Sequence, residues 1–178
     1  MDKKALRTDI RRRKANYSPA ELAALSRQIC DSILDDGVFW ASHYILLYSP
    51  LSDEVDVSPL ISAAYNAGKT TILPVVDGEN LILKHFNGFT NMETGEFNIA
   101  EPTGEIFSIS DYHKIDLAFI PGMAFDQHRH RLGRGKGFYD RLLPHLPNAY
   151  KMGICFNFQY LDSIPSEEWD VVMDEVMC

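Results

Sequence analysis

The sequence predicts an α/β fold built around a mainly parallel, buried sheet. Short apolar runs of strand-forming residues alternate with segments whose apolar residues recur at helical spacing. The apolar runs are nearly continuous, as in strands that are covered on both faces. The length of 178 residues and the 46% hydrophobic, 24% charged composition suit one domain with a sizeable core. We therefore expect a single domain over residues 1–178.

Two helices are predicted at the start of the chain. Residues 3–15 form a charged segment with sparse apolar positions at helical spacing. The second helix begins after Ser18, a suitable N-cap, with Pro19 at the first helical position and Glu21 completing a capping box. Its apolar residues recur every three or four positions as far as Ile33, which predicts one buried stripe.

The next part of the chain predicts three strands and one helix. Residues 43–50, "HYILLYSP", form an apolar run that is closed by proline, and residues 58–69 follow with helical spacing. Residues 70–76 and 81–86 are two further strands. The turn at Asp77–Gly78 between them predicts a hairpin.

The second half of the chain begins with a polar stretch, residues 87–113, in which we expect little regular structure. Residues 114–121 and 150–156 are apolar runs that predict buried strands. The segment 138–146 between them has helical character. The closing segment 169–177 is apolar enough for a strand.

Positive charge is gathered in two short segments. The net charge is −8, yet 12 of the 17 Lys and Arg lie within residues 1–14 and 129–141. The rest of the chain has 22 acidic residues against five cations. An acidic body argues against a general nucleic-acid binder, whereas two basic segments that meet in space would form a polyanion site. Alternatively, the N-terminal segment is only a solvated helix face.

Composition argues against several other classes. No apolar run approaches the ~20 residues that span a bilayer, and the N-terminal segment has no apolar leader core, so we expect a cytoplasmic protein. Cys30, Cys155 and Cys178 are too scattered for a disulfide framework or a CxxC metal site. His128 and His130 have no metal-ligand spacing, and we interpret them as polar loop residues.

The segment "RLGRGKGFYDRLL", residues 131–143, combines permissive backbone with dense positive charge. Its glycines are Gly133, Gly135 and Gly137, and the cations between them are Arg134 and Lys136. Glycines let main-chain N–H groups approach a ligand, and a helix that starts after them favours an anion. The spacing matches neither a Walker A loop nor a dinucleotide fingerprint. A surface turn is the alternative, but a basic cluster after a buried strand favours phosphate.

Carboxylates follow the predicted strands. Residues 50–54 and 121–137 each come after a strand, and ligands of open α/β sheets collect at the carboxyl edge, so both segments should line one edge. Glu54 is placed to accept hydrogen bonds from the N–H groups of a heterocycle. Alternatively, it is only a solvated acidic residue of the loop. Asp140 and Asp170 are candidate ligands for Mg²⁺, which prefers oxygen, with an ion-pair partner as the commoner role of a single carboxylate.

The segment 121–143, "PGMAFDQHRHRLGRGKGFYDRLL", resembles the motif of the 5-formyltetrahydrofolate cyclo-ligase family, also called methenyltetrahydrofolate synthetases. The resemblance covers essentially the whole chain. Further matching segments, in the expected order, are "KKALRTDIRRR", "DEVDVSPLISAAYNAGKTTILPVV", "EPTG" and "WDVVMDEV".

This resemblance implies a single three-layer α/β domain of the glucosamine-6-phosphate isomerase and CoA-transferase type (NagB/RpiA/CoA transferase-like). It implies a cytoplasmic ligase of folate metabolism that converts 5-formyltetrahydrofolate, ATP and Mg²⁺ to 5,10-methenyltetrahydrofolate, ADP and phosphate. We expect a monomer that binds these small molecules and neither nucleic acid nor membrane. The implied ATP-binding residues are Lys3, Lys4, Arg7, Arg131, Gly133, Arg134, Gly135, Lys136, Gly137 and Asp140. The implied catalytic residues are Arg134, Lys136 and Tyr139, the folate-binding residues Glu54, Phe138 and Tyr139, and the metal ligands Asp140 and Asp170.

One position departs from the family pattern, since Trp169 stands where a histidine commonly precedes the aspartate. Two other functions remain open. A sugar-phosphate isomerase or CoA transferase on the same fold would use Glu54 as base or nucleophile. A non-catalytic scaffold would use the basic N-terminus as an RNA-contacting arm, with strongly salt-dependent affinity.

Overall fold

The computed structural model describes residues 2–168 and 170–178, so the position of Trp169 lies outside the described residues. A six-stranded sheet in the order β11-β9-β6-β1-β2-β3 forms the centre. Its neighbours pair in parallel except β2 and β3, which are antiparallel. The predicted α/β fold with a mainly parallel sheet is thereby confirmed. The strands are β1 (Tyr44–Leu46), β2 (Thr70–Asp77), β3 (Asn80–His85), β6 (Leu117–Pro121), β9 (Tyr150–Ile154) and β11 (Glu175–Met177).

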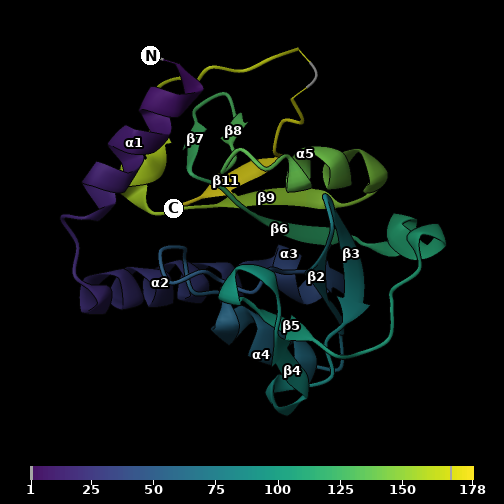
Figure 1. Ribbon diagram of the computed structural model, residues 1–178. Coiled ribbons are helices and arrows are strands. Elements are labelled where there is room, and N and C mark those ends of the chain that lie inside the picture. Colours follow the sequence, from purple (N-terminus) through teal and green to yellow (C-terminus); the bar gives the residue numbers. More distant parts are fainter. Residues whose placement is uncertain (1, 169) are drawn as a thin grey trace.

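Helices cover both faces of this sheet, as Figure 1 shows. On one face lie α2 (Pro19–Leu34), α3 (Gly37–Ala41) and α4 (Ser58–Asn66). On the other lie α5 (Phe138–Leu142) and the 3₁₀ turns at Ile109–Lys114 and Leu143–His145. Alternate residues of a strand therefore point into different cores: Ile45 packs against the α2 side, and Leu46 against the α5 side.

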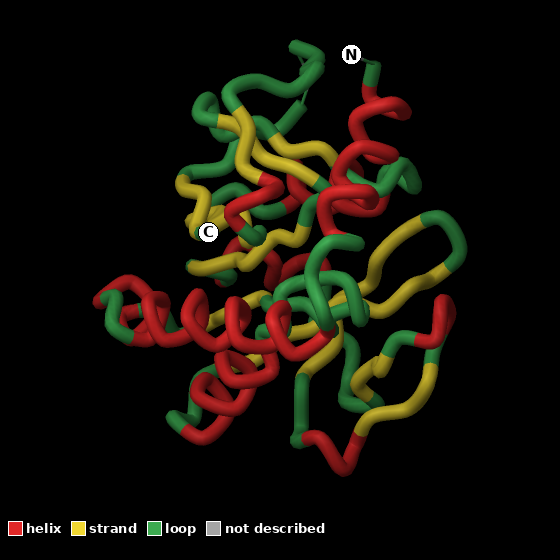
Figure 2. The backbone as a smooth tube through the Cα atoms, turned by 90° about the vertical axis from the view of Figure 1, so that its left-hand side faces the viewer, coloured by secondary structure: helices red, strands yellow, loops and turns green. Residues whose placement is uncertain are grey.

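The N-terminal helix α1 (Lys3–Lys14) lies away from the main sheet, beside a smaller one. That sheet has the order β10-β7-β8, from β7 (Ala124–Asp126), β8 (Arg131–Leu132) and β10 (Tyr160–Leu161). Leu6 and Ile10, four residues apart on one helix face, are buried against Met123 and Leu132. This packing sets α1 next to the segment that follows β8 (Figures 1 and 2).

The predicted helix starts agree with the structure. The hydroxyl of Ser18 accepts a hydrogen bond from the Glu21 amide, and the Glu21 carboxylate accepts one from the Ser18 amide. The capping box is therefore present, and burial of Ile29 and Ile33 confirms the predicted stripe. The hairpin at Asp77–Gly78 is also confirmed, with Gly78 at a φ of 60°.

Other boundaries differ. The strand expected over 43–50 ends at Leu46, since the chain then leaves the sheet to form the loop before α4. The helix expected over 138–146 becomes one turn of α5 and a 3₁₀ turn, since Pro144 lacks the amide hydrogen that would continue it. The polar stretch 87–113 contains a small hairpin of β4 (Met92–Thr94) and β5 (Ala100–Pro102), which the sequence pattern did not predict.

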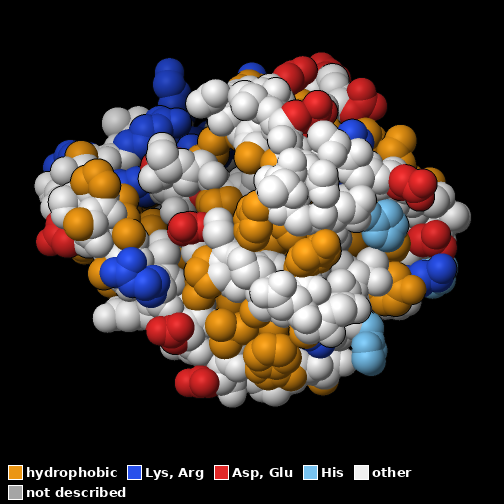
Figure 3. All heavy atoms as spheres, turned by 90° about the horizontal axis from the view of Figure 1, so that it is seen from below, with side chains coloured by type: hydrophobic (Ala, Val, Ile, Leu, Met, Phe, Trp, Pro, Cys, Tyr) orange, Lys and Arg blue, Asp and Glu red, His pale blue; other side chains and the backbone are white. Residues whose placement is uncertain are grey.

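The charge pattern divides the surface. Lys and Arg side chains gather towards the left of Figure 3, the side on which Figure 1 places α1, whereas acidic side chains are scattered over the whole face that is shown. Within the described part of the chain, no helix has the length and apolar character to cross a membrane.

Candidate active site

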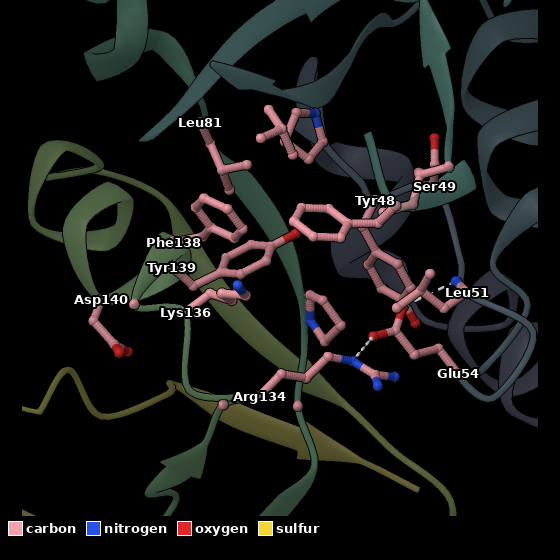
Figure 4. A pocket seen from close by; sticks show the side chains of 18 of the residues that line it. Tyr48, Ser49, Leu51, Glu54, Leu81, Arg134, Lys136, Phe138, Tyr139 and Asp140 are labelled. Carbon is pink, nitrogen blue, oxygen red and sulfur yellow. Dashed lines mark hydrogen bonds and ion pairs between the residues drawn. The ribbon is translucent and has the colours of Figure 1, made fainter. Parts of the chain in front are cut away.

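A cavity of about 370 Å³ lies at the carboxyl end of β1, between the loop that follows this strand and the glycine-rich loop 133–137. Apolar and aromatic side chains line much of it, including Tyr48, Leu81, Phe138 and Tyr139. In Figure 4 the Tyr139 side chain points into the cavity, toward the side on which Tyr48 and Leu51 lie. The residues that follow two distant strands thus meet at one edge, as the sequence predicted.

An ion-pair cluster connects the two loops. Arg134 Nε donates to Glu54 Oε1 at 3.0 Å, and Arg134 Nη2 donates to Asp53 Oδ1 at 2.5 Å (Figure 4 shows the first). Burial opposes the charge on Arg134, but the hydrogen bonds and charges of Asp53 and Glu54 raise its pKa above the usual value. Arg134 is therefore held as a cation against the β1–α4 loop.

Glu54 has both carboxylate oxygens engaged. Oε1 accepts from Arg134, and Oε2 accepts from the Leu51 amide at 3.1 Å. The Glu54 side chain is only 11% exposed, and it lines the cavity. Its position is consistent with the predicted folate contact, while its charge is balanced by Arg134.

Helix α1 contacts the glycine loop directly. Arg7 Nε donates to the carbonyl oxygen of Gly133 at 2.7 Å, so the two basic segments of the sequence meet in space. At the other end of α1, buried Lys14 hydrogen-bonds to the main chain and side chain of Asp53, with Nζ–Oδ2 at 3.3 Å. Burial lowers the pKa of Lys14, and the Asp53 carboxylate partly offsets this effect.

Lys3 and Lys4 are the other two N-terminal cations predicted as ATP-binding residues. Lys3 Nζ is 3.3 Å from Asp170 Oδ2, which also accepts from the Glu167 amide at 2.8 Å. Lys4 is exposed. The structure thus brings Arg7 to the glycine loop, and it places Lys3 beside a predicted metal ligand.

Arg131 holds the base of the loop. Its guanidinium is 2.5 Å from Asp140 Oδ1, donates to the Pro121 carbonyl at 3.2 Å, and lies 5.4 Å from the Tyr139 ring centre. Only 6% of the Arg131 side chain is exposed, against 64% of Asp140. Arg131 therefore serves to fix the loop on β6, and Asp140 stands at its open side.

Two loop glycines adopt backbone angles that favour glycine. Gly135 has a φ of 100° and Gly137 a φ of 73°, in the left-handed region that side chains disfavour. Gly137 directly precedes the first turn of α5, where Phe138 and Tyr139 enter the cavity lining. The glycines are thus needed for the turn that directs these rings.

Lys136 is exposed and differs from its neighbours in having no ion-pair partner among residues 2–168 and 170–178. Its Nζ lies 5.6 Å from the centre of the Phe97 ring, and both residues line the cavity. Since Arg134 and Arg131 are paired with carboxylates, Lys136 is the loop cation whose charge is most available to an anionic ligand.

Burial raises the pKa of both cavity tyrosines, Tyr48 and Tyr139, above the ordinary value for a phenol, and the charge of Glu54 adds to this effect. Both remain protonated at neutral pH. Tyr48 already donates its hydroxyl hydrogen to the Val55 carbonyl at 3.0 Å. Tyr139 is therefore suited to donate a hydrogen bond and unsuited to act as a base.

The predicted metal ligands are separate surface carboxylates. No group of three His, Cys, Asp or Glu suited to a metal occurs among the described residues. Asp140 Oδ2 and Asp170 Oδ1 make no hydrogen bond within that part of the chain, so each carboxylate keeps one oxygen available. Mg²⁺ in nucleotide sites is commonly held by one or two carboxylates together with phosphates and water, and Asp140 beside the loop fits this pattern.

Several cavity residues were not predicted as site residues. They include Arg11, Phe97 and Glu101, which reach the cavity from α1 and from the β4–β5 hairpin. Asp53 does not line the cavity, but it takes part in the ion-pair cluster beside Glu54 and was not predicted either. The "EPTG" segment contains Glu101, but only as a family match. Nothing in the local pattern indicates that the polar stretch 87–113 folds back over the sheet edge.

Comparison with known proteins gives one consistent match. The model of the 5-formyltetrahydrofolate cyclo-ligase family matches residues 1–178. The chain is 27% identical to the 5-formyltetrahydrofolate cyclo-ligase of Escherichia coli K12 over 94% of its length and 95% of the relative's. It is 28% identical to that of Haemophilus influenzae, over 97% and 95%.

Solved structures agree. The NMR structure of Aquifex aeolicus 5,10-methenyltetrahydrofolate synthetase has a TM-score of 0.87 and 32% identity, covering 99% of this chain and 89% of that one. The Mycoplasma pneumoniae enzyme has a TM-score of 0.77 and 27% identity, covering 99% and 98%. The assignment to the glucosamine-6-phosphate isomerase and CoA-transferase fold type stays a prediction.

Proposed function

Because the chain belongs to the 5-formyltetrahydrofolate cyclo-ligase family over its whole length, we propose that it converts 5-formyltetrahydrofolate to 5,10-methenyltetrahydrofolate with consumption of ATP. The family match confirms the resemblance seen in the sequence. The single observation that most supports ATP as co-substrate is the contact of Arg7 with Gly133, which joins both basic segments at the mouth of one cavity. Phosphate groups at the loop and a folate against the aromatic wall are the occupants that fit.

The reaction requires activation of the formyl group. Its oxygen is a poor leaving group, so it first attacks the γ-phosphorus of ATP, and ADP departs. N10 then attacks the formyl carbon, the bond from carbon to the phosphorylated oxygen breaks, and phosphate leaves. N10 loses its proton, and the methenyl bridge results. The protein contributes chiefly by aligning two substrates and by balancing charge on the transferred group.

The chain's own groups divide into three roles. Lys136 and the loop amides face the phosphates, and Arg7 holds the loop closed through Gly133. Phe138 and Tyr139 form a wall for the folate, with Tyr139 keeping its proton as a hydrogen-bond donor. Glu54 contacts the heterocycle. Arg134 keeps Glu54 in place, and its further role at the phosphates stays a prediction.

Mg²⁺ belongs to this proposal as the counter-ion of ATP. Asp140 is the carboxylate that fits it best, since it is exposed beside the loop, and Asp170 stands next to Lys3 at the N-terminal end. The ion supplies positive charge that screens the phosphate oxygens. The monomeric state and cytoplasmic location stay predictions.

The rival isomerase and CoA-transferase functions need Glu54 as a free base or nucleophile. Both of its oxygens already accept hydrogen bonds, one of them from a guanidinium, so a substrate would have to displace a donor to reach the carboxylate. We therefore favour the ligase reaction.

The decisive experiment is direct. Purified protein is incubated with 5-formyltetrahydrofolate and MgATP, and the absorbance of the methenyl product is followed together with phosphate release. We expect one phosphate per methenyl group, with no signal when either substrate or Mg²⁺ is omitted. ATP hydrolysis that is independent of the folate, or product formation without ATP, would overturn the proposal.

A further inference from the structure

A further carboxylate of the cavity lining is that of Glu101. Glu101 is on β5 in the small hairpin, is only 7% exposed, and lines the cavity together with Val76 and Phe97. No cation forms an ion pair with it in the part of the chain that the structure describes. A buried ionised carboxylate that lacks a cationic partner is costly unless hydrogen-bond donors reach it.

The protein supplies one such donor. Glu101 Oε1 accepts a hydrogen bond from the Val76 amide at 3.1 Å, which also fastens β5 to β2. Its other oxygen, Oε2, accepts no hydrogen bond within residues 2–168 and 170–178. One acceptor atom of a buried carboxylate is thus left over at the cavity.

The backbone leaves room for this carboxylate. A Cβ atom placed on Gly95, at the tip side of the same hairpin, would lie 1.9 Å from Glu101 Oε2 and 2.1 Å from its carboxyl carbon. Any residue but glycine at position 95 would displace the carboxylate. The hairpin therefore holds the Glu101 side chain in one place through the Val76 amide on one side and Gly95 on the other.

Glu101 and Glu54 differ in electrostatic state. Glu54 is paired with Arg134 and also accepts from Leu51, so its charge is balanced before any ligand arrives. Among the described residues, Glu101 has neither a cationic partner nor a second hydrogen-bond donor. Compared with Glu54, Glu101 therefore gains more hydrogen-bond energy when a ligand brings an N–H group.

We propose that Glu101 is a specificity-determining residue whose free oxygen accepts a hydrogen bond from an N–H group of the substrate's reduced pterin. This inference rests on the proposed function. A reduced pterin carries an exocyclic amino group and ring N–H groups, whereas the other end of a folate carries carboxylates. The carboxylate of Glu101 attracts the first end and repels the second, while Arg11 supplies positive charge at the cavity for the second. Glu101 thereby sets the direction in which the folate enters.

The test compares Glu101→Gln with Glu93→Gln. Glutamine keeps an oxygen acceptor for the Val76 amide and the side-chain volume, but it replaces the free acceptor by an NH₂ donor. Glu93 is exposed and pairs with Glu101 across the same hairpin, so its substitution changes the same charge on the same element. For each protein, KM is measured for 5-formyltetrahydrofolate and for ATP, with direct binding of 5-formyltetrahydrofolate by calorimetry and a thermal melt.

We expect Glu101→Gln to raise KM and Kd for 5-formyltetrahydrofolate about 10-fold to 100-fold, which corresponds to one lost charge-assisted hydrogen bond. KM for ATP should change less than about 2-fold, and Glu93→Gln should behave as wild type. Equal effects on ATP and folate, or an unchanged folate KM with a lowered melting temperature, would show a merely structural role and overturn the inference.

Two further outcomes are separable. If the wild-type protein neither binds 5-formyltetrahydrofolate nor forms the methenyl product, the proposed function itself fails. If Glu101→Gln does not fold, a structure of the wild-type protein with 5-formyltetrahydrofolate decides: a pterin N–H within hydrogen-bond distance of Glu101 Oε2 supports the inference, and a folate tail at that oxygen overturns it.

Discussion

Arg134 donates to Glu54 across 80 residues of sequence, and this contact joins the glycine loop, where we propose that phosphate binds, to the loop after β1, where we propose that folate binds. Arg134 stands between two loop glycines, and Glu54 stands in the loop after β1. A movement of the glycine loop therefore changes the surroundings of Glu54. The predictions below separate the two sides of the cavity and test this connection.

Lys136→Ala should raise KM for ATP about 10-fold or lower kcat, with the melting temperature unchanged. The ammonium group is exposed and has no carboxylate partner in the described residues. Its loss therefore removes a positive charge that is available to the ligand, and it breaks no ion pair within the fold. Steady-state kinetics with varied ATP measure the effect. Lys114→Ala, at a lysine paired with Asp111 on a 3₁₀ turn outside the cavity lining, is the control. Wild-type kinetics in Lys136→Ala would contradict the phosphate role.

Glu54→Gln should weaken folate binding more than ATP binding. The substitution keeps an acceptor oxygen but removes the charge that Arg134 balances, so the guanidinium is left with Asp53 alone. We expect KM for 5-formyltetrahydrofolate to rise by about 10-fold, from the loss of one charged acceptor. Equal loss for both substrates would mean that the effect passes through Arg134 to the loop.

Arg7→Ala should loosen the N-terminal helix from the glycine loop. The change removes the hydrogen bond to the Gly133 carbonyl, worth about 1–2 kcal/mol, and we expect a higher KM for ATP with a small fall in melting temperature. Arg12→Ala is the matched control on the same helix, because 81% of the Arg12 side chain is exposed and its partner Asp9 is on α1 itself. If both variants show the same KM for ATP and the same melting temperature, the contact with Gly133 does not contribute to ATP binding.

Asp126 should give the protein part of its resistance to acid. Burial opposes ionisation of this carboxyl, but hydrogen bonds from the His130 and Ile164 amides and from the His130 ring outweigh it, and its pKa lies below the usual range. A lowered folded-state pKa contributes stability that is present above the ordinary carboxyl pKa of about 4 and is lost as pH falls through the folded value.

Asp126→Asn should therefore reduce the free energy of unfolding at pH 7 by about 2–3 kcal/mol and flatten its decline below about pH 4. Urea unfolding at a series of pH values measures both effects. Asp162→Asn, at an exposed aspartate, should leave the curve unchanged. If the free energy of unfolding of Asp126→Asn falls with decreasing pH in parallel with that of the wild type, another group causes the loss of stability in acid.

The sequence predicted the central fold well because its signals are local. The capping box at Ser18 and Glu21, the hairpin at Asp77–Gly78 and the apolar runs of the strands are each visible within a few residues. The glycine loop and Glu54 were found as candidates on similar grounds. Their meeting at one edge followed from the direction of parallel strands.

What the sequence did not predict depends on contacts between distant segments. The partner of Arg134 could not be chosen from the many acids of the chain, so the Asp53 and Glu54 cluster was missed. The hairpin that carries Glu101 has two strands of three residues each, too short for a periodic pattern. Glu101 becomes notable only when the Val76 amide and Gly95 are seen beside its carboxylate.

Arg7 donates its hydrogen bond to a main-chain oxygen of the glycine loop. The contact between the N-terminal helix and the loop therefore depends on the backbone conformation of the loop and not on its side chains. An arriving triphosphate that draws the loop amides toward itself must reorient the adjoining peptide planes, and the Gly133 carbonyl moves with them. A fluorophore at Thr8, which is exposed and adjacent to Arg7 on α1, would then report nucleotide occupancy even in a variant that has lost all turnover. The position of α1 would thus indicate whether a nucleotide is bound at the glycine loop.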